Sequence, residues 1–234
     1  MDVARFDRRK YKTVTVREGY GAWAATYEDP VLNLLDLRLL ERLEAVPWSA
    51  QRRVADLACG TGRVGAWLKE RGAEAIEGVD LTPEMLARAR AKAVYASLTV
   101  ADVAATTLAF DSYDLVTAAL VDEHLAELGP LYREAARIAR PGGYFVLVGY
   151  HPFFLLNGIP THFDSASGEP LAIECYVHLF SDHVEAAHAA GWRLQEMREG
   201  LVDAAWLEHK PKWERYLAQP VSFALAWQLR DEAD

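Results

Sequence analysis

The stretch VADLACGTGR, residues 54–63, decides the fold class of this chain. Its first five residues are apolar apart from Asp56 and are typical of a short buried strand. The pattern G-x-G-x-x-G follows directly at residues 60–65, and a helix is expected from there to about residue 71. A glycine-rich turn between a strand and a helix lets the backbone approach a ligand closely at the helix N-terminus. By itself this pattern does not identify the ligand.

Strands and helices alternate on the C-terminal side of this stretch. Further strands are expected at residues 75–80, 98–101, 113–119 and 144–148, with helices at about 82–93 and 130–139. The last third is expected to hold strands at 173–180, 192–202 and 221–229, with a helix at 181–190. Such alternation is typical of an α/β fold with a doubly wound parallel sheet and helices on both faces. Ligands of such sheets bind at the carboxyl ends of the strands.

Composition and charge exclude several function classes. The chain has 234 residues and a formal net charge of -9, so nucleic acid is a poor candidate for a partner. The longest apolar run, residues 144–156, is interrupted by glycine, histidine and proline, and we expect no membrane insertion. Only two cysteines are present and the N-terminus lacks an apolar signal segment, which together favour the cytoplasm.

Three aspartates lie on three successive strands, with Asp56 inside the first, Asp80 at the end of the second and Asp102 at the end of the third. Because these strands are parallel, the three carboxylates are expected to line one crevice. A dinucleotide site uses only the second acid, for ribose hydroxyls, and further acids would repel its pyrophosphate. A ligand with ribose, adenine and a cationic end fits three acids better. S-adenosylmethionine has these groups and carries no phosphate.

Five segments follow one another in a characteristic order and spacing. They are VADLACGTGR, EGVDLTPEML (77–86), VADV (100–103), YDLVTAALVDEHL (113–125) and RIARPGGYFVLV (137–148). Over about residues 50–150 the chain resembles class I S-adenosylmethionine-dependent methyltransferases of the small-molecule type. The resemblance implies a Rossmann-like sheet of seven strands, mostly parallel with an antiparallel last strand. It implies a single domain over residues 1–234, with an N-terminal helical cap at about 1–47 and a lid insertion at about 151–180.

The resemblance also implies which residues contact the cofactor, whose product is S-adenosylhomocysteine. They lie on the glycine turn and at the strand ends, and they are Asp56, Ala58, Gly60, Gly62, Asp80, Leu81, Met85, Asp102, Val103 and Ala119. Asp80 would accept hydrogen bonds from both ribose hydroxyls, and Asp102 from the adenine amine. Asp56 either contacts the methionine part or only holds the loop backbone, and Met85 either meets the adenine or is plain helix core.

The segment before the sheet carries an aromatic face. Residues 16–28 place Tyr20, Trp23 and Tyr27 at helical spacing, and leucines at residues 31–45 predict a second helix. The aromatic rings either close over the cofactor, where they would attract its sulfonium, or form an ordinary apolar core. We expect Tyr20 to contact the cofactor.

Candidate catalytic residues follow the fourth and fifth strands. Methyl transfer needs an acceptor lone pair aimed at the methyl group, and often a base that removes a proton. Glu123 and His124 follow the fourth strand, and His124 titrates nearest to neutral pH. His151 follows the fifth strand, at the start of a loop over residues 151–172 that has the length of a lid. Alternatively, each histidine is a packed side chain or contacts the substrate without acting as a base. The spacing of the histidines predicts no metal site.

We therefore expect a methyltransferase that modifies oxygen, nitrogen or carbon of a small-molecule acceptor, with a histidine base. The many aromatic residues around the site suggest an aromatic acceptor. An NAD-dependent oxidoreductase remains an alternative on the glycine pattern alone. A protein that keeps the cofactor fold but has lost catalysis is the third possibility. The oligomeric state is not encoded in any pattern of the chain.

Overall fold

The computed structural model describes residues 1–230, and seven strands of that part form its central sheet. In sheet order they are β4 (Ser97–Val100), β3 (Ala75–Asp80), β2 (Arg53–Leu57), β5 (Tyr113–Ala119), β6 (Ala139–Tyr150), β10 (Pro220–Leu229) and β9 (Trp192–Leu201). The strands from β4 to β6 run parallel, and β10 pairs antiparallel with both β6 and β9. The predicted seven-stranded, mostly parallel Rossmann-like sheet with an antiparallel last strand is confirmed.

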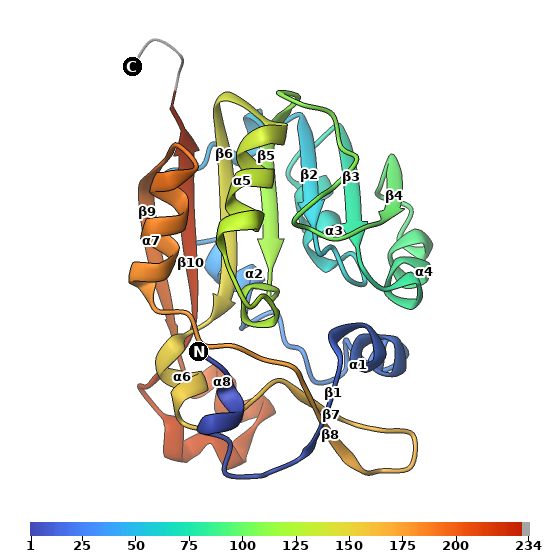
Figure 1. Ribbon diagram of the computed structural model, residues 1–234, viewed down its shortest axis with the longest axis vertical. Coiled ribbons are helices and arrows are strands. Elements are labelled where there is room, and N and C mark those ends of the chain that lie inside the picture. Colours follow the sequence, from blue (N-terminus) through green and yellow to red (C-terminus); the bar gives the residue numbers. More distant parts are fainter. Residues whose placement is uncertain (231–234) are drawn as a thin grey trace.

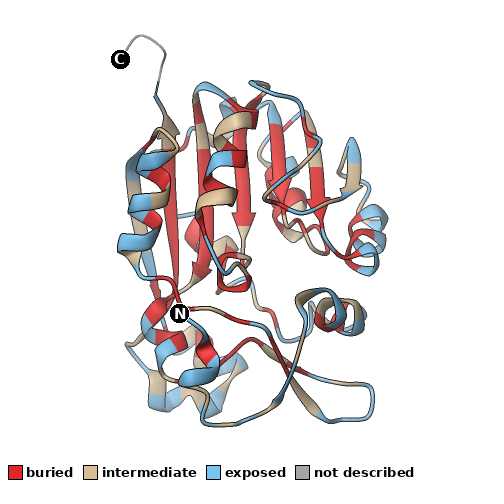
Figure 2. Cartoon of the chain, in the orientation of Figure 1, coloured by how far each residue is buried: buried red, intermediate tan, exposed pale blue. Residues whose placement is uncertain are grey.

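Helices cover both faces of this sheet. They are α2 (Leu37–Leu40), α3 (Arg63–Glu70), α4 (Pro83–Ala91), α5 (Gly129–Ile138) and α7 (Phe180–Ala189). Alternate residues of β6 face opposite sides, so Phe145 packs in the cluster that contains α5, whereas Val146 packs in the cluster that contains α3. Figure 2 shows the central strands buried along most of their length, with α5 and α7 exposing their outer faces. Such two-sided burial explains why these strands are apolar runs without polar alternation.

A second, three-stranded sheet lies beyond the carboxyl ends of the parallel strands (Figure 1). Its strands are β1 (Lys12–Val14), β8 (Pro170–Ile173) and β7 (His162–Asp164), and β1 pairs with β8 in parallel. Helices α1 (Val16–Trp23), α6 (Pro152–Leu156) and α8 (Ala204–His209) pack around it, with 3-10 turns at Val3–Arg5, Trp48–Ala50, Asp122–His124 and Pro211–Tyr216. Residues 12–23 and residues 152–173 therefore join in one layer over the edge where ligands of this fold bind.

Several local predictions were wrong. Of the helix expected over residues 31–45, only α2 is helical, and the cap contains a strand that the sequence pattern did not reveal. Of the strand expected at residues 173–180, only Ile173 lies in a strand, as the last residue of β8. The loop expected at 151–172 contains α6, β7 and most of β8.

Gly158 connects the lid to the N-terminal segment and supports a stability prediction. Its φ is +75°, and a Cβ added there would meet the backbone carbonyl oxygen of Phe6. Gly168 has a similar φ of +79° but open space around the added atom. We expect Gly158→Ala to lower the free energy of unfolding by about 3 kcal/mol, and Gly168→Ala by about 1 kcal/mol for the left-handed backbone alone. Urea denaturation measures the free energy of unfolding of both variants. An equal loss in the two would show that the backbone around Phe6 moves aside without cost and would contradict the prediction.

Candidate functional site

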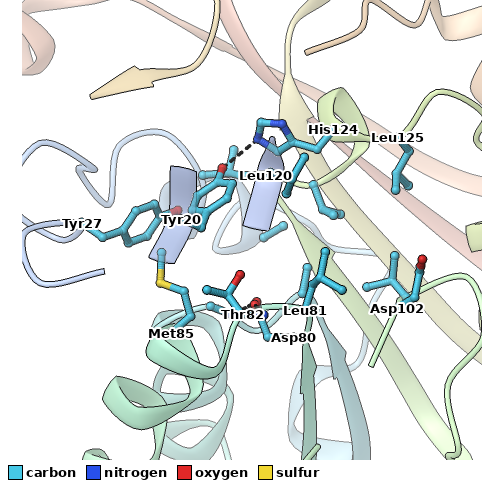
Figure 3. A pocket seen from close by; sticks show the side chains of 16 residues that line it. Tyr20, Tyr27, Asp80, Leu81, Thr82, Met85, Asp102, Leu120, His124 and Leu125 are labelled. Carbon is cyan, nitrogen blue, oxygen red and sulfur yellow. Dashed lines mark hydrogen bonds between the residues drawn. The ribbon is translucent and has the colours of Figure 1, made fainter. Parts of the chain in front are cut away.

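A cavity, called the main cavity here, lies where β2, β3, β4 and β5 end beneath helix α1, with an empty volume of about 800 Å³ including its open mouth. Figure 3 shows Asp80, Leu81, Thr82 and Met85 on one side of it and Tyr20 with His124 on the other. The lining residues are Val16, Tyr20, Tyr27, Ala58, Gly60, Asp80, Leu81, Thr82, Met85, Asp102, Val103, Ala119, Leu120, Val121, His124 and Leu125. Segments far apart in the sequence therefore converge on one hollow at the carboxyl edge of the sheet.

The glycine turn between β2 and α3 forms one wall of the main cavity. Ala58, Gly60 and Gly62 all have positive φ, between +52° and +85°, so the turn folds back sharply before α3 begins at Arg63. Ala58 and Gly60 line the cavity, whereas Gly62 does not. A Cβ on Gly62 would lie 2.9 Å from the Tyr95 ring, so this glycine allows close packing behind the turn.

Asp80 is the most firmly held acid of the cavity. One carboxylate oxygen accepts a hydrogen bond from the Gly60 N–H at 2.8 Å, and the other accepts one from the Thr82 N–H at 2.8 Å. The residue is 8% exposed, and burial raises the pKa of its carboxyl group above the usual range. Each oxygen keeps a further lone pair, so the two can accept a pair of hydroxyl donors from the cavity side.

The opposite end of this wall is more open. The Asp102 side chain accepts a hydrogen bond from the Ala104 N–H at 2.8 Å and lies at the exposed rim. Met85 and Val103 are buried and line the floor, while Leu81 is 38% exposed over the mouth. A flat apolar group can therefore lie between these side chains with a carboxylate at its edge.

Asp56 lies behind the main cavity and does not line it. Its carboxylate accepts hydrogen bonds from the Tyr95 hydroxyl at 2.7 Å and from the Thr117 hydroxyl at 2.8 Å. Burial raises the pKa of this group to about 6. Asp56 reaches a smaller hollow beside the glycine turn, which the Arg63 side chain also lines. Asp56 thus ties β2 to β5 and to Tyr95, and it faces this smaller hollow instead of the main cavity.

His124 and Tyr20 form a hydrogen-bonded pair across 104 residues of sequence (Figure 3). His124 Nδ1 lies 2.7 Å from the backbone carbonyl oxygen of Glu174, which can only accept, so Nδ1 carries the proton of the neutral ring. The lone pair is then on Nε2, and the Tyr20 hydroxyl donates to it at 2.8 Å. A proton acceptor is thus fixed in orientation at the wall of the main cavity.

Glu123 is buried next to this pair and does not line the cavity. Its Oε1 atom lies 3.6 Å from His124 Nε2 and 3.5 Å from the Thr161 hydroxyl. Burial raises the pKa of Glu123 to about 7, and the same cause raises that of the adjacent Asp122 to about 7. Glu123 can therefore act on the cavity only through His124.

His151 lies outside the main cavity and caps helix α6. Its Nδ1 atom accepts a hydrogen bond from the Phe153 N–H at 3.1 Å, and Nε2 lies 2.8 Å from Glu199 Oε1. The structure thus brings His124 to the cavity and leaves His151 in a structural position. Among residues 1–230 no group of three potential ligand side chains is arranged to hold a metal ion. Within the same residues no helix has the length and apolar character needed to cross a membrane.

Sequence reasoning missed several wall residues. Leu120, Val121 and Leu125 line the cavity because the chain leaves β5 through a positive φ of +56° at Leu120. A leucine gives no sequence signal for a positive φ, so this turn could not be predicted. Val16 and Thr82 were missed as well. Val16 lies one turn before Tyr20 in α1, and Thr82 directly follows Leu81, so their closeness to predicted cofactor contacts is the signal that could have identified them.

Comparisons with known proteins agree with this geometry. Residues 55–147 match a family model described as a methyltransferase domain. The chain is 31% identical over 208 residues to malonyl-[acyl-carrier protein] O-methyltransferase from Halorhodospira halophila, covering 86% of this chain and 64% of that protein. It is 28% identical over 200 residues to ubiquinone biosynthesis O-methyltransferase from Xanthomonas oryzae, covering 81% of this chain and 80% of that one.

The chain spans less than two thirds of the first of these relatives, and 49% of a demethylmenaquinone methyltransferase from Thermus thermophilus to which it is 38% identical over 109 residues. Among solved structures, an S-adenosylmethionine-dependent methyltransferase from Mesorhizobium loti has the same fold, with a TM-score of 0.66 and 23% identity over 86% of this chain and 99% of that one. The match to the family model, the relatives and the strand order all agree. Residues 55–147 therefore match a methyltransferase domain, and the chain has the fold of a solved S-adenosylmethionine-dependent methyltransferase.

Proposed function

We propose that this protein transfers a methyl group from S-adenosylmethionine to an oxygen atom of a small, aromatic or otherwise apolar acceptor. The relatives from Halorhodospira halophila and Xanthomonas oryzae, which each align with at least four fifths of this chain, are both named as O-methyltransferases, which favours oxygen as the acceptor atom. The net charge of -9 and the cap over the main cavity disfavour a nucleic-acid acceptor.

The main cavity fits the cofactor along its long wall. Asp80 would accept hydrogen bonds from both ribose hydroxyls, because each of its oxygens has one lone pair left after binding the loop backbone. Asp102 would accept from the adenine amine at the rim, with the Val103 N–H as a donor to the ring. Leu81 and Met85 would enclose the adenine faces.

The glycine turn would hold the methionine end. Ala58, Gly60 and Ala119 line the cavity here, and Asp56 lies behind them, bonded to Tyr95 and Thr117. The Tyr20 ring stands on the opposite wall, where an aromatic face would attract a sulfonium. When bound, the cofactor supplies an electrophilic methyl carbon on this sulfonium, and its sulfur keeps the electron pair of the broken bond.

Proton removal is assigned to Tyr20 and His124 acting together. Tyr20 donates its proton to His124 Nε2 and so presents oxygen lone pairs to the cavity. The hydroxyl proton of the acceptor would pass to the Tyr20 oxygen while the Tyr20 proton passes to Nε2. The resulting imidazolium would be stabilised by the Glu174 carbonyl on Nδ1 and by the Glu123 carboxylate near Nε2. In this role Glu123 is a positioning residue.

One observation carries the proposal. A single cavity combines two carboxylates at adjacent strand ends with a fixed Tyr–His pair on the facing wall. Calorimetric titration with S-adenosylhomocysteine tests its cofactor half, and NADH serves as the competing ligand. We expect S-adenosylhomocysteine to bind and to raise the melting temperature, and NADH to do neither. Stabilisation by NADH alone would favour the oxidoreductase alternative instead.

A further inference from the structure

A second cavity lies beneath the aromatic face of α1, with an empty volume of about 650 Å³ including its open part. It is built from three segments, residues 23–35, 150–162 and 206–213, and shares no residue with the main cavity. Its lining residues are Trp23, Pro30, Val31, Leu32, Leu35, Tyr150, Phe154, Ile159, Pro160, Thr161, His162, Trp206, Lys210 and Trp213. None of them is an aspartate or a glutamate, although acids outnumber bases in this chain by nine.

The walls of the second cavity are aromatic. Trp206 and Trp213 stack with ring centroids 5.0 Å apart, and Phe154 lies 5.4 Å from Trp213. Trp23 closes the other side and stacks on Phe163 at 5.5 Å. Flat or aliphatic groups are the ligands that such walls hold best, since they release the most water from apolar surface.

Lys210 brings a cation into this aromatic surrounding. Its ammonium lies 4.7 Å from the ring centroid of Trp213 and 6.0 Å from that of Trp206. Within residues 1–230 no carboxylate lies within ion-pair distance of it, and burial lowers the pKa of Lys210. A half-buried ammonium that has only ring faces as partners gains most from a carboxylate that enters with a ligand.

A second cation lies at the same end. The Arg9 guanidinium donates to His162 Nε2 at 2.7 Å, and the His162 Nδ1–H donates to the Pro160 carbonyl oxygen at 2.8 Å. Burial lowers the pKa of His162, and the charges of Arg9 and Lys210 lower it further, while the Pro160 carbonyl and the Asp164 carboxylate raise it. Two cations and one carboxylate therefore act at this end of the second cavity, whereas the main cavity is lined by Asp80 and Asp102.

The two cavities are separated by one aromatic layer. Trp23 lines the second cavity, while Tyr20 and Tyr27 line the main one, and the Trp23 ring lies 5.9 Å and 4.9 Å from theirs. A ligand in the second cavity would thus lie directly behind the rings that face the proposed methyl donor.

We propose that the second cavity is a binding site for a small apolar carboxylate, whose aromatic or aliphatic body packs inside the cavity against Phe154 and Trp213 and whose carboxylate binds Lys210. This ligand class goes beyond the proposed methyl transfer, because it follows from residues that do not line the main cavity.

The probe for this site is 2-naphthoate, with 2-naphthamide as its neutral counterpart of the same shape. Both are titrated by calorimetry into the wild-type protein, Lys210→Met, Lys210→Arg and the matched control Lys212→Met, whose side chain is exposed. We expect one molecule of 2-naphthoate to bind the wild-type and Lys212→Met proteins alike. Binding should weaken by about tenfold or more in Lys210→Met and be retained in Lys210→Arg. The amide should bind all four proteins weakly.

Two results would overturn the assignment: no binding of 2-naphthoate to the wild-type protein, or equal binding to Lys210→Met. Melting curves of the four proteins show whether each is folded, and Lys210→Arg covers the case in which the methionine variant is not. S-adenosylhomocysteine is titrated into the same samples. Its failure to bind would refute the proposed methyl transfer while the naphthoate titration still decides the second site.

Discussion

Replacing Asp80 by alanine is expected to weaken S-adenosylhomocysteine binding by about 100-fold, as measured by calorimetric titration. The carboxylate is assigned both ribose hydroxyls, and each charge-assisted hydrogen bond contributes about 1.5–3 kcal/mol. The substitution also leaves the Gly60 and Thr82 N–H groups without their acceptor, so the glycine turn loses its fixed shape. Both effects reduce affinity.

Two further variants make this result specific. Glu77→Ala changes an acid on the same strand that pairs with Arg53 away from the cavity, and it should bind S-adenosylhomocysteine like the wild type. Asp102→Ala should weaken binding by about tenfold, because its carboxylate is exposed and keeps only a local backbone contact. Wild-type affinity in Asp80→Ala would show that this residue does not bind the cofactor. If Asp80→Ala does not fold, the affinity of Asp102→Ala for S-adenosylhomocysteine tests the placement of the cofactor at these strand ends.

Replacing His124 by asparagine is expected to lower kcat by about 10²–10⁴-fold, the usual contribution of a general base, while S-adenosylhomocysteine binding is unchanged. The asparagine amide can still donate to the Glu174 carbonyl, but nothing remains at the place of Nε2 to receive the Tyr20 proton. Turnover is measured as S-adenosylhomocysteine released from S-adenosylmethionine in the presence of a panel of phenolic and carboxylic acceptors.

His188→Asn is the matched control, since His188 is exposed on α7 and far from the cavity lining. It should turn over like the wild type. Tyr20→Phe should resemble His124→Asn in kcat, because it removes the hydroxyl that connects the acceptor to the base. If His124→Asn kept full turnover, methyl transfer would proceed by proximity alone and His124 would only support the Tyr20 hydroxyl.

The sheet was predictable because its signals are local. β2, β3 and β5 are apolar runs with turn residues at their ends, and the observed bounds of β5 are the predicted residues 113–119. The helix expected at 31–45 failed because its leucines serve two different cores. Leu35 packs with the cap and Leu39 packs against α3, so the chain must turn between them. The buried ion pair of Asp36 with Arg63 stands at that turn.

The strand expected at 173–180 shows a different limit. Ile173, Cys175 and Val177 are buried in alternation, as the sequence pattern indicates. Their segment nevertheless joins no sheet beyond Ile173, because its N–H groups bond to separate partners. The Glu174, Tyr176 and Val177 N–H groups donate to the carbonyl oxygens of Val14, Glu123 and Met1. Alternating burial therefore identifies an extended segment but not its hydrogen-bond partners.

The candidate site was predictable where one strand and its turn supply the residues. Asp80, Leu81 and Met85 follow one another and all line the main cavity. Asp56 differs because it lies inside β2 and its side chain is held by Tyr95, a contact made between distant segments. The pairing of Tyr20 with His124 likewise depends on how the cap docks, which no local pattern contains. The second cavity depends on three separate segments for the same reason.

The parallel pairing of β1 with β8 has a consequence for synthesis on the ribosome. Lys12 pairs with Leu171, and helix α1, which carries Tyr20, follows β1 directly. The strands from β2 to β6 are synthesised before β8, and domains begin to fold during synthesis. A nascent chain that stops before residue 170 therefore has the carboxylates of the main cavity, but it lacks the β8 strand with which β1 pairs beside helix α1. Its His124 also lacks the Glu174 carbonyl that sets the tautomer, so the base is completed only in the last third of translation.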